Sequence, residues 1–326
     1  MNNQAALSQI GILKSGIQTT IQDLGRTGYR HLGIAQAGAL DRYSLILANK
    51  LVGNPEHCAG IEIMIGPVEI QFHRDTWFAL CGANFGAELN GRPIAKAWRH
   101  FARAGQILVL RGAVKEALAY MTVDGGIHNE IVLGSRATDL QAGIGGHFGR
   151  ALKKGDLLKI GTPQQSQQAR RSVGVQQRIW TPEIRAIRGP EYSQFDSDSQ
   201  KKFWQQAWKV SSQSNRMGYR LIGESNDKRS SNQLTRIEQK ELLSHGVVPG
   251  VVQVPANGQP IVLLADCQTT GGYPKIACVI EADLWKIAQT PIGQHFCFIE
   301  VDQALAMEAQ QKWQRELARI HGAANV

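Results

Sequence analysis

A short polar segment at residues 266–274, with the sequence DCQTTGGYP, carries the residues of this chain best suited to chemistry. Its two adjacent glycines let backbone N–H groups approach a ligand closely, and its hydroxyl, amide and carboxyl groups supply donors and acceptors. Apolar runs at 261–265 and 276–280 predict strands that hold this polar tip on a rigid support, as in many binding loops. The pattern favours a ligand-binding hairpin, and a plain β-hairpin with a Gly-Gly turn is the structural alternative.

A second polar segment at 211–223 reads SSQSNRMGYRLIG. Its two arginines, Arg216 and Arg220, are suited to bidentate contact with a carboxylate or a phosphate. The pattern Arg-x-Gly-Tyr-Arg-x-x-Gly occurs here and again at 26–33, as RTGYRHLG. This echo indicates two related barrels, two arginine-bearing loops that meet at one site, or a chance match. His31 and His245 adjoin such loops and are candidates for an acid or a base, although a lone histidine is more often a hydrogen-bonding residue.

Several classes of site are absent from the sequence. There is no GxxxxGK[ST] phosphate loop and no Gly-x-Ser-x-Gly elbow, and the glycine-rich GIGGHFG at 143–149 lacks the spacing and context of a dinucleotide fingerprint. No methionine precedes a lysine, as in a biotin carrier, and the nine histidines and five cysteines show no metal-ligand spacing. We therefore expect no metal site and no complete enzyme of a motif-defined class.

The elements that position these segments are short and mostly β. The 326 residues include 34 glycines, with 43% apolar and 19% charged residues, which is typical of a turn-rich globular protein with many short strands. Asp41 predicts the N-cap of a helix that Gly53 ends, and a second helix is predicted over 197–208. A polar stretch at 161–171 predicts a linker between an N-terminal β-rich domain at 1–162 and a C-terminal domain at 172–326 that ends in a helix.

Charge and cysteine usage limit the partners and the cellular compartment that the sequence predicts. The net charge of +9 does not come from a basic run, and aromatic content is only 7%, so the sequence does not favour a nucleic-acid partner. A basic surface of this kind also suits an anionic small ligand. The chain shows no signal peptide and no apolar run long enough to cross a membrane, and its unpaired cysteine spacing favours reduced thiols. We expect a cytoplasmic protein that does not act at a membrane.

Four strings in order, QDLGRTGYRHLG, AGALDRYSLILANKLVGNP, SSQSNRMGYRLIG and GVVQVPANGQPIVLLADCQTTGGYP, resemble the allophanate hydrolase subunit 2 family. This is the carboxyltransferase-type domain found in urea amidolyase and in bacterial ATP-dependent 5-oxoprolinase, and the resemblance covers residues from about 12 to 300. It implies a mainly β fold with peripheral helices, a β-rich α+β class, built from two cyclophilin-like β-barrel domains.

The resemblance also implies an activity and partners. It favours membership of a 5-oxoprolinase complex that uses ATP to hydrolyse 5-oxo-L-proline to L-glutamate, with the nucleotide on this chain or on a partner. The implied partners are a subunit 1 homologue, similar to the B subunit of 5-oxoprolinase, and a lactam-utilisation protein, similar to the A subunit of that complex. The alternatives are a biotin-dependent carboxyltransferase subunit that uses carboxybiotin, and a non-enzymatic antagonist of a kinase inhibitor.

Both enzymatic alternatives act on an amide-like group, which needs donors aimed at its oxygen and a route for a proton. For the catalytic roles we predict Asp266, Arg216 and Tyr273. The predicted substrate-binding residues come from all three polar segments and from a nearby strand: Arg26, Tyr29, Asn215, Tyr219, Arg220, Gln253, Gln268, Thr269, Thr270, Gly271 and Gly272.

Overall fold

The computed structural model describes residues 9–163, 171–223, 233–238 and 241–323. The chain forms two compact units, and each unit is built from segments that are not contiguous in the sequence. Unit 1 contains residues 1–27, 37–179 and 315–326, and unit 2 contains residues 28–36 and 180–314. The units therefore differ from two contiguous domains, because 28–36 belongs to unit 2 and the chain end belongs to unit 1. Most of the predicted linker, residues 164–170, lies outside the described residues.

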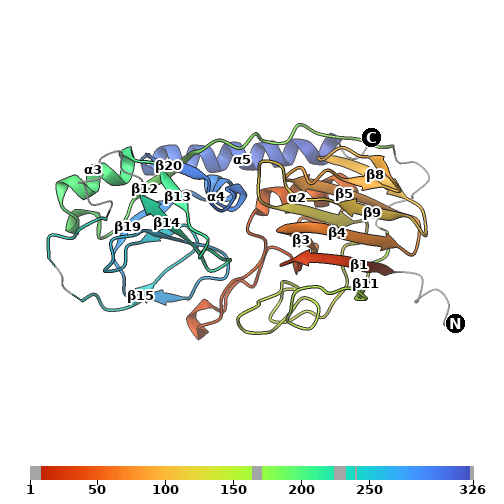
Figure 1. Ribbon diagram of the computed structural model, residues 1–326, viewed down its shortest axis with the longest axis horizontal. Helices are drawn as coiled ribbons and strands as arrows, with labels where there is room; N and C mark the ends of the chain where they lie inside the picture. The colour runs from red at the N-terminus through yellow and green to blue at the C-terminus, as the bar shows by residue number, and fades with distance from the viewer. Residues whose placement is uncertain (1–8, 164–170, 224–232, 239–240, 324–326) are drawn as a thin grey trace. The chain divides into compact units, whose positions relative to one another are not determined.

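Unit 1 is built from two sheets (Figure 1). The six-stranded sheet has the order β11 (Leu157–Lys159), β1 (Gln9–Ile17), β4 (Ile65–Phe72), β9 (Ile107–Leu110), β6 (Glu88–Leu89) and β7 (Arg92–Pro93). The five-stranded sheet has the order β2 (Thr20–Gln22), β3 (Gly60–Ile63), β10 (Ala119–Val123), β5 (Thr76–Gly82) and β8 (Trp98–Ala102). Neighbouring strands pair antiparallel in both sheets, for example β1 with β4 and β10 with β5.

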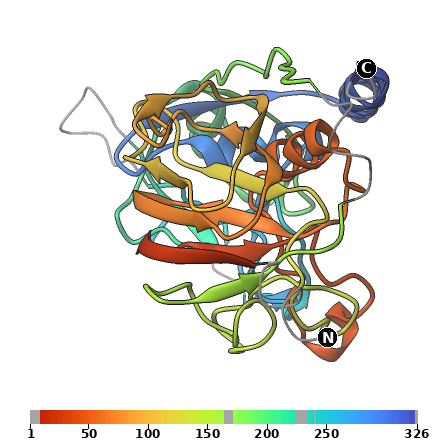
Figure 2. The same ribbon diagram turned by 90° about the vertical axis from the view of Figure 1, so that its right-hand side faces the viewer.

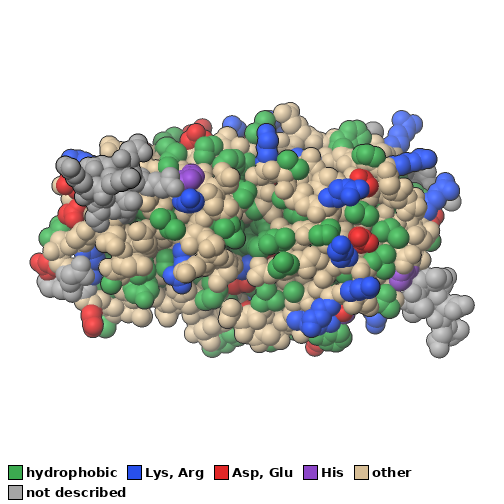
Figure 3. Space-filling model, viewed as in Figure 1, with side chains coloured by type: hydrophobic (Ala, Val, Ile, Leu, Met, Phe, Trp, Pro, Cys, Tyr) green, Lys and Arg blue, Asp and Glu red, His purple; other side chains and the backbone are tan. Residues whose placement is uncertain are grey.

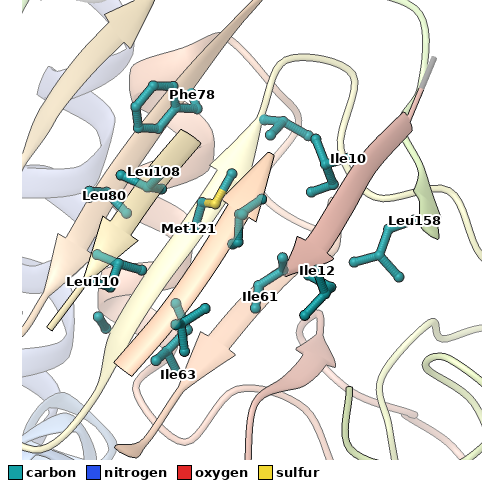
Figure 4. Packing of buried hydrophobic residues seen from close by; sticks show 14 of the residues in the cluster. Ile10, Ile12, Ile61, Ile63, Phe78, Leu80, Leu108, Leu110, Met121 and Leu158 are labelled. Atoms are coloured by element: carbon teal, nitrogen blue, oxygen red, sulfur yellow. The ribbon is translucent and has the colours of Figure 1, made fainter. Parts of the chain in front are cut away.

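Apolar side chains from both sheets of unit 1 form one core (Figure 4). Ile10 and Ile12 come from β1 and Leu108 from β9, while Ile61 and Met121 come from the other sheet. All are almost fully buried. Burial of each such side chain is worth about 1.5–3 kcal/mol, so the core stabilises the pairing of the two sheets.

Helix α2 (Arg42–Val52) confirms the predicted start and stop signals. The Asp41 carboxylate accepts a hydrogen bond from the Ser44 backbone N–H at 2.9 Å, and Gly53 adopts a left-handed conformation with φ of 81°. Such a cap satisfies an otherwise unpaired donor of the first turn, and glycine takes this φ without a steric cost. The helix lies against β5 and β10 of unit 1.

A closed barrel of seven strands forms unit 2. Around the barrel the order is β12 (Glu183–Arg188), β19 (Lys275–Val279), β16 (Val251–Gln253), β17 (Ile261–Leu263), β14 (Gly218–Gly223), β13 (Trp208–Val210) and β20 (His295–Glu300). A separate two-stranded ladder joins β15 (His245–Gly246) to β18 (Thr270–Gly271). The helical elements are η1 (Arg30–Leu32), η3 (Tyr192–Gln194), α3 (Ser197–Gln205), η4 (Glu281–Asp283), α4 (Leu284–Gln289) and α5 (Gln303–Ala323). The mainly β class is confirmed; the closed barrel lies in unit 2, whereas unit 1 has two sheets.

The surface carries mixed charge. On the face shown in Figure 3, Lys and Arg side chains lie scattered among apolar and acidic ones. Within the described ranges, no helix combines the length and apolar character needed to span a membrane. The same residues contain no group of three or more His, Cys, Asp or Glu side chains placed to hold a metal ion.

Asp156 anchors the loop that precedes β11 in unit 1. Its carboxylate accepts hydrogen bonds from Arg150 Nη1 at 2.8 Å, from Arg150 Nη2 at 2.9 Å and from the Lys153 backbone N–H at 2.8 Å. The hydrogen bonds from Arg150 are the main reason that the pKa of Asp156 falls to about 2. These bonds stabilise the charged carboxylate in the folded state only.

We expect Asp156→Asn to reduce the free energy of unfolding by about 1–2 kcal/mol at pH 7. Because the folded pKa is depressed, the contribution is present above the ordinary aspartate pKa of 3.8 and is lost as the pH falls towards 2. Urea unfolding of both proteins at several pH values measures this difference. The matched control is Glu88→Gln, which removes an exposed pair with Arg111 and should change stability by less than about 0.5 kcal/mol. A constant difference between pH 7 and pH 2 would contradict the role of the Asp156 charge.

Candidate functional site

The polar segment 266–274 connects two strands of the barrel that are not neighbours. It leaves β17 at Leu263 and enters β19 at Lys275, and β16 lies between these strands and pairs antiparallel with both. The predicted hairpin is therefore wrong in its pairing: β17 and β19 both run antiparallel to β16 and hence parallel to each other, so the segment is part of a crossover connection. Part of it, Thr270–Gly271, instead forms a ladder with His245–Gly246. The segment is thus held at both ends by the barrel and at its middle by β15.

A buried ion pair fixes the start of this segment. Arg216 Nε donates to Asp266 Oδ2 at 2.8 Å, and Arg216 Nη2 donates to Asp266 Oδ1 at 3.0 Å. The Asp266 backbone N–H also donates to the Arg216 carbonyl at 3.1 Å. Both residues are only 4% exposed. This bidentate pair ties the arginine segment at 211–223 to the polar segment, and each charge depends on the other for its stability.

A second arginine contacts the same segment and comes from the repeated pattern at residues 26–33. Arg30, in η1, donates through Nη2 to the Gln268 carbonyl at 2.9 Å and to the Val247 carbonyl at 2.5 Å. The same nitrogen lies 3.9 Å from Cys267 Sγ. The two echoed sequences therefore meet at 266–268 through Arg30 and Arg216, but they do not share a structure, since one forms a 3-10 helix and the other forms β14. Burial raises the pKa of Cys267, with a partial offset from Arg30, so this thiol is a poor nucleophile at neutral pH.

A register shift between β16 and β19 lies beside Gln253, which contacts the polar segment. Val252 pairs with Ala277, but the next residue, Gln253, pairs with Lys275 instead of Ile276. Such an irregularity re-aims a side chain, and residues opposite each other in an antiparallel pair extend to the same side of the sheet. Gln253 is 1% exposed and accepts a hydrogen bond from Gln268 Nε2 at 3.3 Å. Its own Nε2 is buried and has no hydrogen-bond partner among the described residues.

Gly271 lies against this glutamine, and a larger residue there would require the Gln253 side chain to shift. A Cβ at position 271 would come within 2.4 Å of Gln253 Nε2, whereas a Cβ at Gly246, on the facing strand, would meet nothing within 4 Å. We expect Gly271→Ala to displace Gln253 and to lower turnover at least about tenfold, since a shift of about 1 Å in a positioning group can cost that much. Gly246→Ala is the matched control and should keep wild-type turnover. Equal activity of the two variants would show that the Gln253 position does not matter.

Lys275, His245 and Glu191 form a chain of titratable groups beside the glycine, here named the lysine chain. Lys275 Nζ is in hydrogen-bond contact with His245 Nε2 and donates to the Gly271 carbonyl at 3.1 Å. His245 Nε2 also lies 3.3 Å from Glu191 Oε1, and the other Glu191 oxygen accepts the Lys275 backbone N–H at 2.9 Å. Lys275 is 2% exposed, while the His245 side chain is 48% exposed. Burial lowers the pKa of Lys275, and the Glu191 carboxylate offsets only part of this effect.

The lysine chain can share a proton and pass it on. A protonated Lys275 amine donates to His245 Nε2, and the same ring nitrogen faces the Glu191 carboxylate. A lysine with a lowered pKa next to a half-exposed histidine is a typical arrangement for a general base and its route to solvent.

The structure brings six of the fourteen predicted residues together around the segment 266–271 of unit 2. Asp266, Arg216, Gln253, Gln268 and Gly271 lie in the network, and Thr270 belongs to β18. Five others lie at its margins or point elsewhere: Asn215, Arg220 and Tyr273 are exposed, Thr269 accepts the Val247 N–H through its carbonyl, and the Tyr219 hydroxyl donates to the Ala288 carbonyl. A Cβ at Gly272 would come within 3.1 Å of the Leu242 carbonyl, and Tyr29 precedes η1.

Arg26 lies apart from these residues, in unit 1. It is 1% exposed, and its guanidinium donates to the Ala137 carbonyl. The sequence analysis missed Lys275 and Glu191, and it held His245 only as a candidate acid or base. A single lysine at the edge of an apolar run was the available signal for Lys275, and no signal marked Glu191. The assigned roles of all these residues stay predictions.

Comparison with known proteins matches residues 32–300 to the family described as carboxyltransferase domain, subdomain A and B. The C subunit of 5-oxoprolinase from Escherichia coli strain K12 is 48% identical over 314 residues, which are 95% of this chain and 98% of that protein. The C subunit of 5-oxoprolinase from Haemophilus influenzae is 40% identical over 93% of this chain and 94% of that protein. A solved structure of the Kluyveromyces lactis urea amidolyase has a TM-score of 0.86 and 26% identity, with 96% of this chain but only 20% of that chain covered. The range matched by the family includes Glu191, His245 and Lys275.

Proposed function

We propose, from the premise that this chain belongs to the family of carboxyltransferase domains with subdomains A and B, that it is a subunit of an ATP-dependent 5-oxoprolinase. In this proposal the assembled complex hydrolyses 5-oxo-L-proline to L-glutamate. The observation that supports it most is the 48% identity to the C subunit of the Escherichia coli 5-oxoprolinase, which extends over nearly the whole of both chains. Such a role implies partner chains, and we expect one similar to the B subunit of 5-oxoprolinase and one similar to its A subunit, the lactam-utilisation protein.

The lysine chain suits the proton transfers of lactam opening. Hydrolysis of an amide requires a proton to be taken from the attacking water and a proton to be given to the leaving nitrogen. An unprotonated Lys275 accepts the first proton, and its contact with His245 provides the exchange with solvent. Glu191 positions the His245 ring through the 3.3 Å contact between Oε1 and Nε2.

Two buried donors suit the oxygen of the same substrate. Gln253 Nε2 and Arg30 Nη1 are both buried, and neither has a hydrogen-bond partner in the part of the chain that the structure describes. A buried donor without an acceptor costs about 1–3 kcal/mol, which an amide oxygen or a carboxylate of the substrate would recover. Gln268 links the two donors, since its carbonyl accepts from Arg30 and its side chain donates to Gln253. The two donors therefore belong to one hydrogen-bond network, and they are positioned in advance to stabilise the negative charge that develops on the substrate oxygen.

ATP and the partner chains complete the proposal. Phosphorylation of the lactam oxygen would activate the ring carbon for addition of water. The ring C–N bond would then break as the nitrogen takes a proton, and hydrolysis of the resulting acyl phosphate would release phosphate and L-glutamate. We propose that the nucleotide binds on this chain or is shared with a partner subunit. The proton-transfer role proposed for the lysine chain is the same wherever the nucleotide binds.

Carboxyl transfer is a second candidate function. The fold likeness to the Kluyveromyces lactis urea amidolyase, with a TM-score of 0.86, favours it. In this alternative carboxybiotin is the donor and urea or a related amide is the acceptor. A lysine of lowered pKa beside buried N–H donors would serve equally to deprotonate a ureido nitrogen, so the site chemistry does not separate the two functions. The extent of the identity does favour 5-oxoprolinase.

The experiment is to purify the chain with its genomic neighbours and to offer two substrate pairs. The first pair is 5-oxo-L-proline with ATP, and the second is urea with carboxybiotin. We expect ATP hydrolysis that depends on 5-oxoproline. Turnover of the second pair only, by a well-formed complex, would replace the proposal by the carboxyltransferase alternative.

A further inference from the structure

A cavity of about 840 Å³ lies in unit 1, between the edge strand β11 and the glycine-rich segment 143–149. The segment is the yellow-green loop next to β11 in Figure 1, and it is seen from another side in Figure 2. Apolar side chains such as Ile127, Ile144 and Leu158 line the cavity together with four glycines of the loop. Its size is that of a small-molecule site.

The loop that borders the cavity is fixed in place by its glycines. A Cβ at Gly145 would come within 2.1 Å of the Ala137 carbonyl oxygen, and one at Gly149 within 1.9 Å of the Gly143 carbonyl oxygen. The Gly149 N–H donates to the Gly145 carbonyl at 2.7 Å, and the Gly146 N–H donates to the Arg136 carbonyl at 3.0 Å. Only glycine fits these positions, so the loop holds one conformation at the cavity wall.

Phe148 is held in an unfavourable conformation at this wall. Its φ of 58° lies in the left-handed region, which bulky residues rarely adopt, and 82% of the residue is exposed. The His147 ring contacts it edge-on with centroids 4.5 Å apart, and the Arg150 guanidinium lies 5.9 Å from the ring centroid. Strain of this kind persists where the surroundings impose it and is concentrated at functional sites. A fixed, exposed aromatic ring beside a cavity is suited to stacking on a flat ligand.

Asn129 supplies an acceptor that lacks a donor. Its Nδ2 donates to the Gly146 carbonyl at 2.8 Å and to the Arg136 carbonyl at 3.2 Å, which fixes the orientation of the amide. Its Oδ1 is then buried, and the described residues offer it no hydrogen-bond partner. Asn129 lines the same cavity as Phe148. A ligand that fits both residues must be flat and aromatic and must carry an N–H donor.

We propose that this cavity binds the adenine ring of ATP, stacked on Phe148 and with its exocyclic amino group donating to Asn129 Oδ1. Lys159, which is exposed and also lines the cavity, suits the phosphates by charge, whereas the exposed Glu130 in the same lining opposes them. The inference rests on the proposed function, in which ATP is a reactant, and it assigns the nucleotide to this chain. Guanine presents an oxygen acceptor where adenine presents the amino group, so it could reach Asn129 Oδ1 only in another pose, through N1–H or its 2-amino group, and this pose favours ATP over GTP.

The test is calorimetric titration of the full-length chain with ATP and with GTP. We expect Phe148→Leu to weaken ATP binding by about fivefold to a hundredfold, the range that loss of base stacking produces. Phe148→Trp, which keeps an aromatic ring, should restore most of the affinity. GTP should bind at least about tenfold more weakly than ATP to the wild-type chain.

Leu133→Ala is the matched control, because Leu133 is also exposed and has a positive φ of 53° but does not line the cavity. This variant should bind ATP as the wild type does. No ATP binding by the chain, or equal binding by wild type and Phe148→Leu, would overturn the site. If Phe148→Leu bound ATP normally but no longer bound a partner chain, the ATP site would also be overturned, and the surface around Phe148 would be assigned to contact with that partner. A complex that still hydrolyses ATP in response to 5-oxoproline would then leave the proposed function intact.

Discussion

Lys275→Arg should lower turnover of the assembled complex by about 10²–10⁴-fold, the usual contribution of a positioned general base. Arginine keeps the positive charge but does not lose its proton in the working pH range. The variant therefore separates a base from a mere cation at the same place. Lys275→Met should show a loss of the same order. The matched control is Lys201→Met, which changes an exposed lysine of α3 and should leave turnover unchanged.

The pH dependence of turnover tests the same residue. Only the unprotonated amine accepts a proton, so wild-type turnover should rise with pH through the lowered pKa of Lys275 and reach its plateau below 10.5, the ordinary lysine value. This rising limb should be absent from the residual activity of Lys275→Arg. If Lys275→Arg had wild-type turnover, position 275 would require only a positive charge, and Lys275 would not be the general base.

Stability provides the control for folding. Because the folded pKa of Lys275 is lowered, the folded protein binds this proton less tightly than the unfolded chain, and folding is disfavoured at pH values below the folded pKa. This cost disappears as the pH rises towards 10.5. Lys275→Met should therefore be at least as stable as the wild type at pH 7, and a loss of turnover in it would not result from unfolding.

Arg216→Met or Asp266→Leu alone should reduce the free energy of unfolding by about 3–5 kcal/mol, because each takes the bidentate partner away from a buried charge. The double variant should recover much of this loss, since both charges are then removed together. We expect a coupling free energy of at least about 2 kcal/mol between the two positions. Denaturant unfolding of the four proteins completes the cycle.

The same four proteins also test the predicted catalytic roles. If the pair serves only to hold the segment 266–274, the double variant should regain turnover together with stability. A stable double variant without turnover would instead support the catalytic roles predicted for Arg216 and Asp266. Independent effects of the two substitutions on stability would contradict the bidentate geometry.

Local signals in the sequence are sufficient for some elements of the fold. Asp41 and Gly53 mark the ends of α2 because caps act within one turn of the helix. The helix predicted over 197–208 ends earlier, at Gln205, because Trp208 is taken into β13 and pairs with Gly223. Apolar spacing alone does not distinguish a last helical turn from the start of a buried strand. The assignment of 28–36 to unit 2 depends on long-range contacts such as those of Arg30, which no local pattern encodes.

The site shows a similar division. Glycines, threonines and glutamine next to apolar runs indicated the segment 266–274, because polar tips between strands are visible in a sequence. The partners of this segment come from distant parts of the chain: Glu191 follows β12, and His245 belongs to β15. Their contacts with Lys275 follow from strand order around the barrel and from the register shift at Gln253, and neither feature leaves a mark in the sequence.

The most direct test of the account is the rate at which the co-purified complex forms L-glutamate from 5-oxo-L-proline in the presence of ATP, with the wild-type chain and with Lys275→Arg. We expect glutamate from the wild-type complex and at least about a hundredfold less from the variant. No glutamate from a well-formed wild-type complex would contradict the proposed function. Equal rates from the two complexes would contradict the assignment of Lys275 as the base.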